Sequence, residues 1–286
     1  MISSPCLAHY GTTLIEPPID ATQIHDAPLA GQVLETARFL ESLGFRPKIT
    51  NIYPGLGRQW ITCRGDEGAP DYLEKDSFSS FAASALEPES DGRPRSGDVV
   101  FRLPETDTAA TLARLRADGY VRNYLDSDGQ FFVGPDGATY ELASATDDPA
   151  ENRTISIWTT AEDVERIAKD YETFFNLPIV ARNVDVDGLA CARATVLRRT
   201  SPGPVTIRLL TLADGRDVAP RIVGANFATN PGEDIFTQGG YGHFRLGAPN
   251  RDVVRENSRK VFDDTGDVAY SLFHHAYLEL VELDPA

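Results

Sequence analysis

The stretch ISIWTTAEDVERIAKDYETFFNLP, from Ile155 to Pro178, carries the clearest structural signals in the sequence. Its first four residues favour a β-strand. Thr160 followed by Asp163 is a capping-box pattern, because the hydroxyl and the carboxylate can both accept hydrogen bonds from free amides in the first turn of a helix. Pro178 ends that helix. The apolar residues in between recur at the spacing of one helix face: Val164, Ile167, Ala168, Tyr171, Phe174 and Phe175.

Three strands are predicted between residues 179 and 212, so the unit consists of a strand, a helix and three strands. The same order recurs in four units that begin near residues 9, 99, 155 and 243. In the second unit, DSDG at 126–129 and GPDG at 134–137 predict hairpin turns, because Gly and Asp tolerate the turn dihedrals. The sequence lacks the regular alternation of parallel α/β proteins. It therefore predicts an α+β fold with mixed sheets that each need one face covered.

The length of the chain predicts two domains. Its 286 residues exceed one average domain. The polar segment 146–152 separates the second unit from the third, and we place the boundary there. The predicted domains are residues 1–146 and residues 151–286, each made of two consecutive units.

Composition excludes several classes of partner. The chain has 27 Lys and Arg against 43 Asp and Glu, a formal charge of -16, which repels phosphate backbones and anionic lipid. No apolar run approaches the length that spans a bilayer, and the N-terminal residues do not resemble a secretory signal. Three distant cysteines, Cys6, Cys63 and Cys191, suit a reducing compartment. We expect a cytoplasmic protein that binds neither nucleic acid nor membrane.

Local catalytic motifs are absent from the sequence. It contains no GxSxG elbow, no Walker A loop and no HExxH pair. Gly239-Gly-Tyr-Gly242 is not a dinucleotide fingerprint, because no βαβ unit surrounds it.

The four strand–helix–strands units resemble the vicinal oxygen chelate superfamily, which includes glyoxalase I, bleomycin-resistance proteins and type I extradiol dioxygenases. Residues 155–178 are similar to the family's opening strand, aspartate, aromatic pair and helix end. Residues 132–142, FVGPDGATYEL, are similar to its closing hairpin. The resemblance covers nearly the whole chain. It implies four βαβββ units paired into two cupped, incomplete mixed-sheet barrels, with the ligand site in the cup of residues 151–286.

The resemblance also implies where a metal ion would be bound in that cup. The first ligand position, seven residues before Asp163, is Ser156, whose hydroxyl is a poor ligand for Fe(II). The second and third positions fall on His243 and Glu279, which match. In the N-terminal cup the position equivalent to His243 is Val100, whereas Glu141 matches the glutamate. The cofactor is therefore predicted to be either none or one divalent ion, Fe, Mn or Zn.

These side chains also have an alternative role that requires no metal. Arg208 can reach the same face, and an Arg208–Glu279 salt bridge would then replace the metal, because a buried lone carboxylate is costly. Residues 213–240 form a long connection that is either a lid or a surface loop. The predicted ligand-binding residues are Ser156, Trp158, Arg208, Tyr241 and Tyr277.

Two functional hypotheses follow. In the first, the C-terminal cup holds a small apolar or aromatic ligand without a metal, as drug-resistance members of the superfamily do. In the second, His243 and Glu279 hold a divalent ion in an enzyme, such as an extradiol-like ring-cleaving dioxygenase, a lyase or an isomerase. A homo-oligomer is compatible with both hypotheses, and the sequence does not decide between them.

Overall fold

The structure of the protein is a computed structural model. It describes residues 10–15, 38–39, 41–43, 46–53, 58–64, 73–78, 93–125, 127, 129–134, 139–219, 242–260, 269–274 and 276–283. The strands are β1 (Tyr10–Ile15), β2 (Arg46–Tyr53), β3 (Arg58–Arg64), β4 (Leu73–Phe78), β5 (Val99–Glu105), β6 (Arg122–Asn123), β7 (Phe131–Val133), β8 (Thr139–Ser144), β9 (Thr154–Trp158), β10 (Ile179–Asp185), β11 (Ala192–Arg199), β12 (Val205–Leu212), β13 (Gly242–Ala248), β14 (Arg259–Lys260), β15 (Ala269–Phe273) and β16 (Ala276–Glu282). The helices are α2 (Thr108–Ala117), α3 (Pro149–Asn152), α4 (Val164–Phe175) and α6 (Arg251–Glu256). In β1 to β4, and at several positions of β13 to β16, only the backbone is described.

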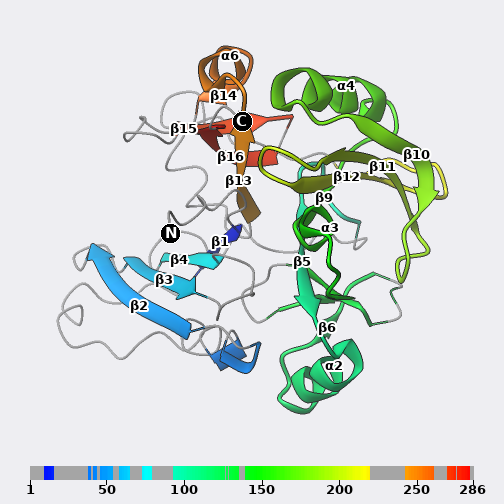
Figure 1. The fold of residues 1–286 in the computed structure, drawn as a ribbon. Coiled ribbons are helices and arrows are strands. Elements are labelled where there is room, and N and C mark those ends of the chain that lie inside the picture. The colour runs from blue at the N-terminus through cyan, green and yellow to red at the C-terminus, as the bar shows by residue number, and fades with distance from the viewer. Residues whose placement is uncertain are drawn as a thin grey trace.

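The strands form two eight-stranded mixed sheets (Figure 1). Sheet I has the order β10-β11-β12-β9-β5-β8-β7-β6, and sheet II has the order β14-β15-β16-β13-β1-β4-β3-β2. The first strands of two units pair antiparallel at the centre of each sheet, β5 with β9 and β1 with β13. The predicted α+β class with mixed sheets is confirmed.

The pairing of the four units differs from the predicted one. Sheet I is built from the second and third units, and sheet II from the first and fourth. The predicted domains 1–146 and 151–286 therefore each contribute one unit to each sheet. The segment 146–152, predicted as a boundary, carries α3 and connects β8 to β9 within one sheet. The prediction paired neighbours in sequence, whereas β5 and β9 pair across that short connection and leave the first and last units to pair with each other.

The third unit forms as its sequence predicts. β9, α4, β10, β11 and β12 lie within a few residues of the expected bounds. The capping box is only half realised at the start of α4. The Asp163 N–H donates to Thr160 Oγ1 over 3.2 Å, but the carboxylate of Asp163 accepts the Thr160 hydroxyl, at 2.9 Å, in place of a backbone amide.

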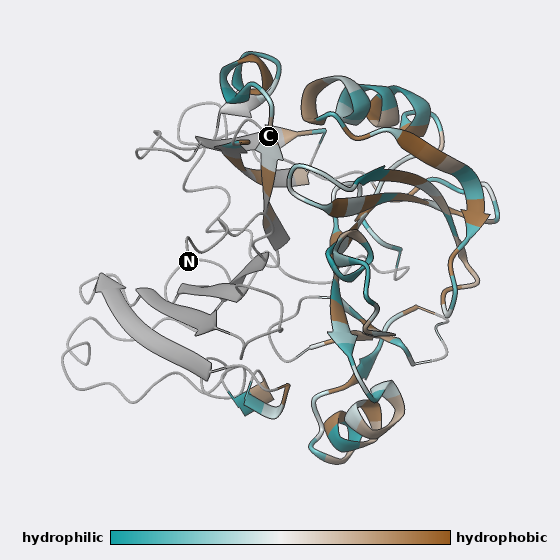
Figure 2. Cartoon of the chain, in the orientation of Figure 1, coloured by the Kyte–Doolittle hydropathy of each residue, from teal (hydrophilic) through white to brown (hydrophobic). Residues whose placement is uncertain are grey.

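One face of sheet I packs against α2 and α4 and forms the main core. Alternate residues of the central strands, such as Phe101 and Ile155, are buried there with Leu115 of α2 and Tyr171 of α4. Figure 2 shows hydrophilic and hydrophobic residues side by side on α4, as expected of a helix with one buried face. The opposite face of each sheet is called its site face below.

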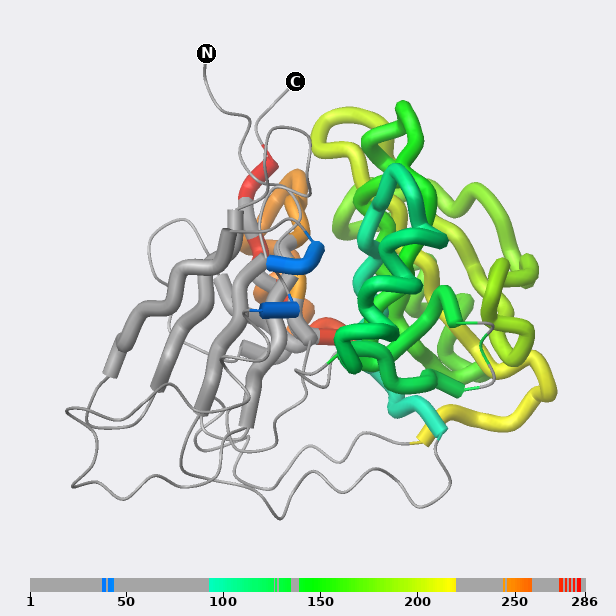
Figure 3. Tube along the Cα trace, turned by 90° about the horizontal axis from the view of Figure 1, so that it is seen from below, coloured from blue at the N-terminus to red at the C-terminus, as the bar shows by residue number. Residues whose placement is uncertain are grey.

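The two sheets meet at α4 and the β15–β16 turn. Phe273 of sheet II is 2% exposed, and its ring lies 5.2 Å from that of Tyr171, 5.9 Å from that of Phe174 and 5.2 Å from that of Phe175. Next to it, His274 Nε2 lies 2.8 Å from the Asp170 carboxylate. Figure 3 shows residues 93–219, coloured teal to yellow, gathered in one half of the molecule.

A buried arginine, Arg199, connects α4 to both sheets by hydrogen bonds. The Arg199 guanidinium donates to the carbonyl oxygens of Phe175 at the end of α4, Gly203 of the β11–β12 turn and Gly247 of β13. Burial lowers the pKa of Arg199 to about 10, so the side chain is still a cation at neutral pH. None of the helices in the described parts of the chain is long and apolar enough to span a membrane.

We predict that Phe273→Ala strongly destabilises the protein. The substitution removes a buried ring that packs on three aromatic rings of α4, so the free energy of unfolding should fall by about 3–5 kcal/mol in urea denaturation. Val253→Ala is the control, because Val253 of α6 belongs to the same unit but is 40% exposed. It should change that free energy by no more than about 0.5 kcal/mol. Equal effects of the two substitutions would contradict this packing.

Candidate functional site

The centre of sheet I brings together four of the residues that sequence analysis singled out. Val100 of β5 pairs with Ser156 of β9, and Ser156 pairs with Arg208 of β12. Arg102, two residues further along β5, pairs with Glu141 of β8. These residues share the site face, because directly paired residues in a sheet point to the same side.

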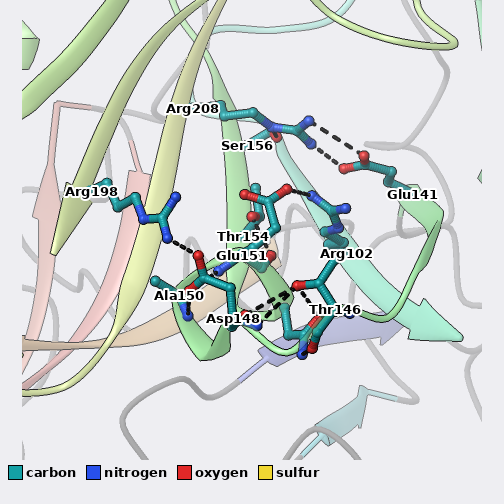
Figure 4. A network of polar contacts seen from close by, with 11 residues as sticks. Arg102, Glu141, Thr146, Asp148, Ala150, Glu151, Thr154, Ser156, Arg198 and Arg208 are labelled. Atoms are coloured by element: carbon teal, nitrogen blue, oxygen red, sulfur yellow. Dashed lines mark hydrogen bonds and ion pairs between the residues drawn. The ribbon is translucent and has the colours of Figure 1, made fainter. Parts of the chain in front are cut away.

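Arg208 joins the two halves of this sheet (Figure 4). Its Nε donates to Ser156 Oγ over 2.8 Å, and its two terminal nitrogens face the two carboxylate oxygens of Glu141, with Nη1 3.3 Å from Oε1. The side chains of Arg208 and Glu141 are 14% and 8% exposed, and Ser156 is fully buried. The guanidinium is thus an internal counter-charge for a buried carboxylate.

The predicted Arg208–Glu279 salt bridge is therefore wrong: Arg208 pairs with Glu141. The cause is the sheet pairing, which puts β12 and β8 in one sheet and β16 in the other. Arg208 nevertheless neutralises a glutamate at a predicted ligand position, which is Glu141 in place of Glu279. Among residues with described side chains, no group of three or more His, Cys, Asp or Glu could hold a metal ion.

Trp158 is part of the core beside this network. It is fully buried, and its Nε1 donates to the Tyr124 hydroxyl over 2.7 Å. Burial, reinforced by the nearby Asp98 carboxylate, raises the pKa of Tyr124, so its phenol stays protonated. Trp158 packs in an apolar cluster with Val100 and Leu210 on the site face. The predicted ligand-binding residues Ser156 and Trp158 are thus enclosed, and neither is accessible to a ligand in this structure.

Two more arginines on this face pair with the segment that connects β8 to β9. Arg102 contacts the carboxylate of Glu151 in α3, and Arg198 of β11 contacts Asp148, the residue that caps α3 (Figure 4). The Asp148 carboxylate also accepts from the amide of Ala150 at the helix start, 2.9 Å away. Sheet I therefore carries three arginine–carboxylate pairs on its site face.

The same register relations can be followed through sheet II, where β1 and β13 pair at the centre. His243 pairs with Gly11 across that centre, as Val100 pairs with Ser156 in sheet I. Glu279 pairs with the residue two positions after His243, as Glu141 pairs with the residue two positions after Val100. The predicted equivalence of His243 with Val100, and of Glu279 with Glu141, agrees with this register.

Sequence analysis missed the contribution of β4. Glu279 pairs with the residue two positions after His243 on β13. Asp76 has the same relation to Gly11, because it pairs with Thr13, two positions after Gly11 on β1. In sheet I the corresponding residue is the buried Leu210. No local signal in the sequence singles out Asp76, because its place in one sheet with His243 depends on the pairing of the first unit with the fourth.

The four corresponding positions therefore differ in chemistry between the sheets. In sheet I they are Val100, Glu141, Ser156 and Leu210, and in sheet II they are His243, Glu279, Gly11 and Asp76. An imidazole and two carboxylates suit a divalent ion, whereas two apolar side chains, a hydroxyl and one arginine-paired carboxylate do not. The position of Arg208 is taken in sheet II by Glu74, so no arginine occupies it there.

Several predicted site residues have no described side chain. His243, Tyr277 and Glu279 are placed by backbone register alone, and Tyr241 lies outside the described residues. Most of the predicted lid, from 220 to 240, lies outside them too. What the structure decides is that Ser156, Trp158 and Arg208 belong to one sheet, and His243, Tyr277 and Glu279 to the other.

Comparison with known proteins identifies the fold class. The chain shares its fold with glyoxalase I and with a candidate dioxygenase, as the resemblance predicted. Glyoxalase I from Zea mays superposes with a TM-score of 0.55 at 12% identity, over 96% of this chain and 93% of that one. A candidate dioxygenase from Bacillus subtilis superposes with a TM-score of 0.54 at 13% identity, over 96% of this chain and 85% of that one. At such identities the likeness concerns the fold alone.

No protein-family model matches the chain. No curated protein matches it with significance either.

We predict that Arg208 and Glu141 act as a coupled pair in stability. Arg208→Met or Glu141→Leu alone leaves a buried charge without its partner, which should lower the free energy of unfolding by about 3–5 kcal/mol. The double substitution removes both charges and should recover most of that loss. Denaturation of the four proteins in urea gives the coupling free energy.

An exposed ion pair provides the control for this cycle. The side chains of Arg216 and Asp214 are 66% and 50% exposed, so Arg216→Ala should cost less than about 1 kcal/mol. Additive losses in the Arg208/Glu141 double variant would contradict the internal counter-charge.

Proposed function

We propose that the protein binds a small molecule on the site face of sheet II, and that His243, Asp76 and Glu279 hold a divalent ion, Fe, Mn or Zn, at that site. The observation that carries the proposal is the contrast between two sheets of the same register. The four central positions of sheet I hold two apolar side chains, one hydroxyl and one ion-paired carboxylate, whereas those of sheet II hold one imidazole, two carboxylates and one glycine. This moves the predicted site from a cup within residues 151–286 to the sheet formed by the first and fourth units.

The donor set is consistent with an ion that keeps open positions. Three protein donors are the usual number in catalytic sites, where substrate or water completes the coordination. Gly11, opposite His243, adds no side chain and leaves room there. A divalent ion bound at such a site acts as a Lewis acid that polarises an oxygen of the bound molecule.

The neighbouring register positions favour a ligand with an apolar or aromatic part. Tyr277 pairs with His243, and Trp60 of β3 pairs with Asp76, so both belong to the site face of sheet II. Aromatic side chains contribute large apolar contact areas to small-molecule sites.

A metal-dependent lyase or isomerase is the second candidate function, and it is favoured over extradiol-like ring cleavage. Non-haem Fe(II) oxygenases typically use two histidines and one carboxylate. The corresponding set here contains one histidine, His243, and two carboxylates. Lewis-acid chemistry requires no second imidazole.

The proposal is tested by the metal content of protein purified without chelators, measured by mass spectrometry. We expect about one divalent ion per chain, and loss of most of it in His243→Ala, Asp76→Asn and Glu279→Gln, because each removes one of three protein donors.

Glu141→Gln is the matched control, since Glu141 occupies the position in sheet I that corresponds to Glu279. It should lower stability and leave the metal content unchanged. A wild-type protein without metal, or equal metal loss in Glu141→Gln and Glu279→Gln, would overturn the assignment to sheet II.

A further inference from the structure

Arg245 lies next to the proposed site of sheet II. It follows His243 by two residues on β13 and pairs with Glu279 of β16. Residues two apart on a strand share a face, so Arg245 belongs to the site face. Arg245 is not one of the proposed metal ligands.

Sheet I contains an arginine at the corresponding position, and its contacts are described. Arg102 follows Val100 by two residues and pairs in register with Glu141. Its guanidinium nevertheless contacts the carboxylate of Glu151, which comes from α3 and not from the sheet. The Arg102 side chain is 11% exposed and that of Glu151 is 35% exposed, so this is a partly buried ion pair. The arginine at this position of sheet I thus forms an ion pair with a carboxylate that lies over the site face.

Glu141 does not compete for Arg102, because Arg208 neutralises it. In sheet II the corresponding glutamate is Glu279, which we propose to be neutralised by a divalent ion. The two sheets would then share one electrostatic arrangement. In each, a cation neutralises the glutamate of the sheet (Glu141 or Glu279), and the neighbouring arginine (Arg102 or Arg245) binds a second carboxylate. In sheet I the second carboxylate is supplied by the protein itself.

We propose that Arg245 binds a carboxylate group of the small molecule that enters sheet II, so that the ligand is a small carboxylic acid with an apolar or aromatic part. This inference rests on the proposed function for the location of the site. The Glu151 carboxylate of α3 occupies the position over sheet I that the ligand carboxylate would occupy over sheet II. Arginine suits this role because its planar fork binds a carboxylate through two parallel hydrogen bonds, which a lysine cannot do.

The test compares benzoate with benzamide, which share a ring and differ in the anionic group. Dissociation constants are measured by calorimetry on metal-loaded full-length protein. We expect benzoate to bind at least about tenfold more tightly than benzamide, because charge-assisted hydrogen bonds are the stronger ones. Arg245→Gln should abolish this preference, and Arg245→Lys should restore only part of it.

Arg102→Gln is the matched control, because it removes the corresponding arginine from sheet I. It should lower stability without changing the benzoate preference. Thermal denaturation shows whether each variant is folded, and Arg245→Lys provides a second variant if Arg245→Gln is not.

Metal content separates the two proposals. Loss of the benzoate preference with unchanged metal content in Arg245→Gln supports the carboxylate site. Loss of the metal in Arg245→Gln would mean that Arg245 only positions Glu279, and this result would overturn the proposed carboxylate site. So would equal binding of benzoate and benzamide, or no benzoate binding, by the wild-type protein. A metal-free wild type that still shows an Arg245-dependent preference for benzoate would overturn the metal proposal alone.

Discussion

The antiparallel pairing of β5 with β9 is the interaction on which the rest of the structure depends. It joins the second and third units through Val99 to Phe101 and Ile155 to Ile157. Each of these strands also pairs in parallel with the last strand of its own unit, β8 or β12. Four first and last strands therefore meet at the centre of sheet I, and the same arrangement recurs in sheet II.

This arrangement of strands explains why Arg208 forms an ion pair with Glu141. A carboxylate enclosed among strands at the centre of a sheet must be compensated by a cation, because a lone buried charge is costly. Glu141 and Ser156 come from different units, and the guanidinium of Arg208 reaches both. Sheet I thereby satisfies its central carboxylate from within. Sheet II has Glu279 at the position that corresponds to Glu141, and Glu74 at the position that corresponds to Arg208.

The contact between the sheets is aromatic and hydrogen-bonded. Phe273 of sheet II packs on three rings of α4, while Arg199 donates to carbonyl groups of α4 and of β13. A buried guanidinium that is shared among backbone carbonyls fixes the distance between the elements that supply them. The end of α4 therefore contacts both sheets through Phe273 and Arg199.

Much of the local structure was predictable from sequence. The apolar spacing of Val164 to Phe175 predicts α4, since one helix face must be buried, and turn residues such as Asp-Gly predict where the strands end. The family pattern also singled out His243, Glu279 and Glu141, since their spacing from the start of each unit is visible in the chain. The sequence could not place Asp76 and His243 in the same sheet. It also could not show that Arg208 pairs with Glu141 and not with Glu279.

The sequence by itself determined the four units, the α+β class and the residues at the equivalent positions of each unit. Only the tertiary structure decided which units pair, and hence which of those residues share a site. The physical reason is that helix periodicity and turn preferences act over a few residues, whereas the pairing of exposed strand edges depends on which edges meet in the folded chain. Once β5 pairs with β9, the edges of β1 and β13 pair with each other, and the first and last units of the chain become one sheet.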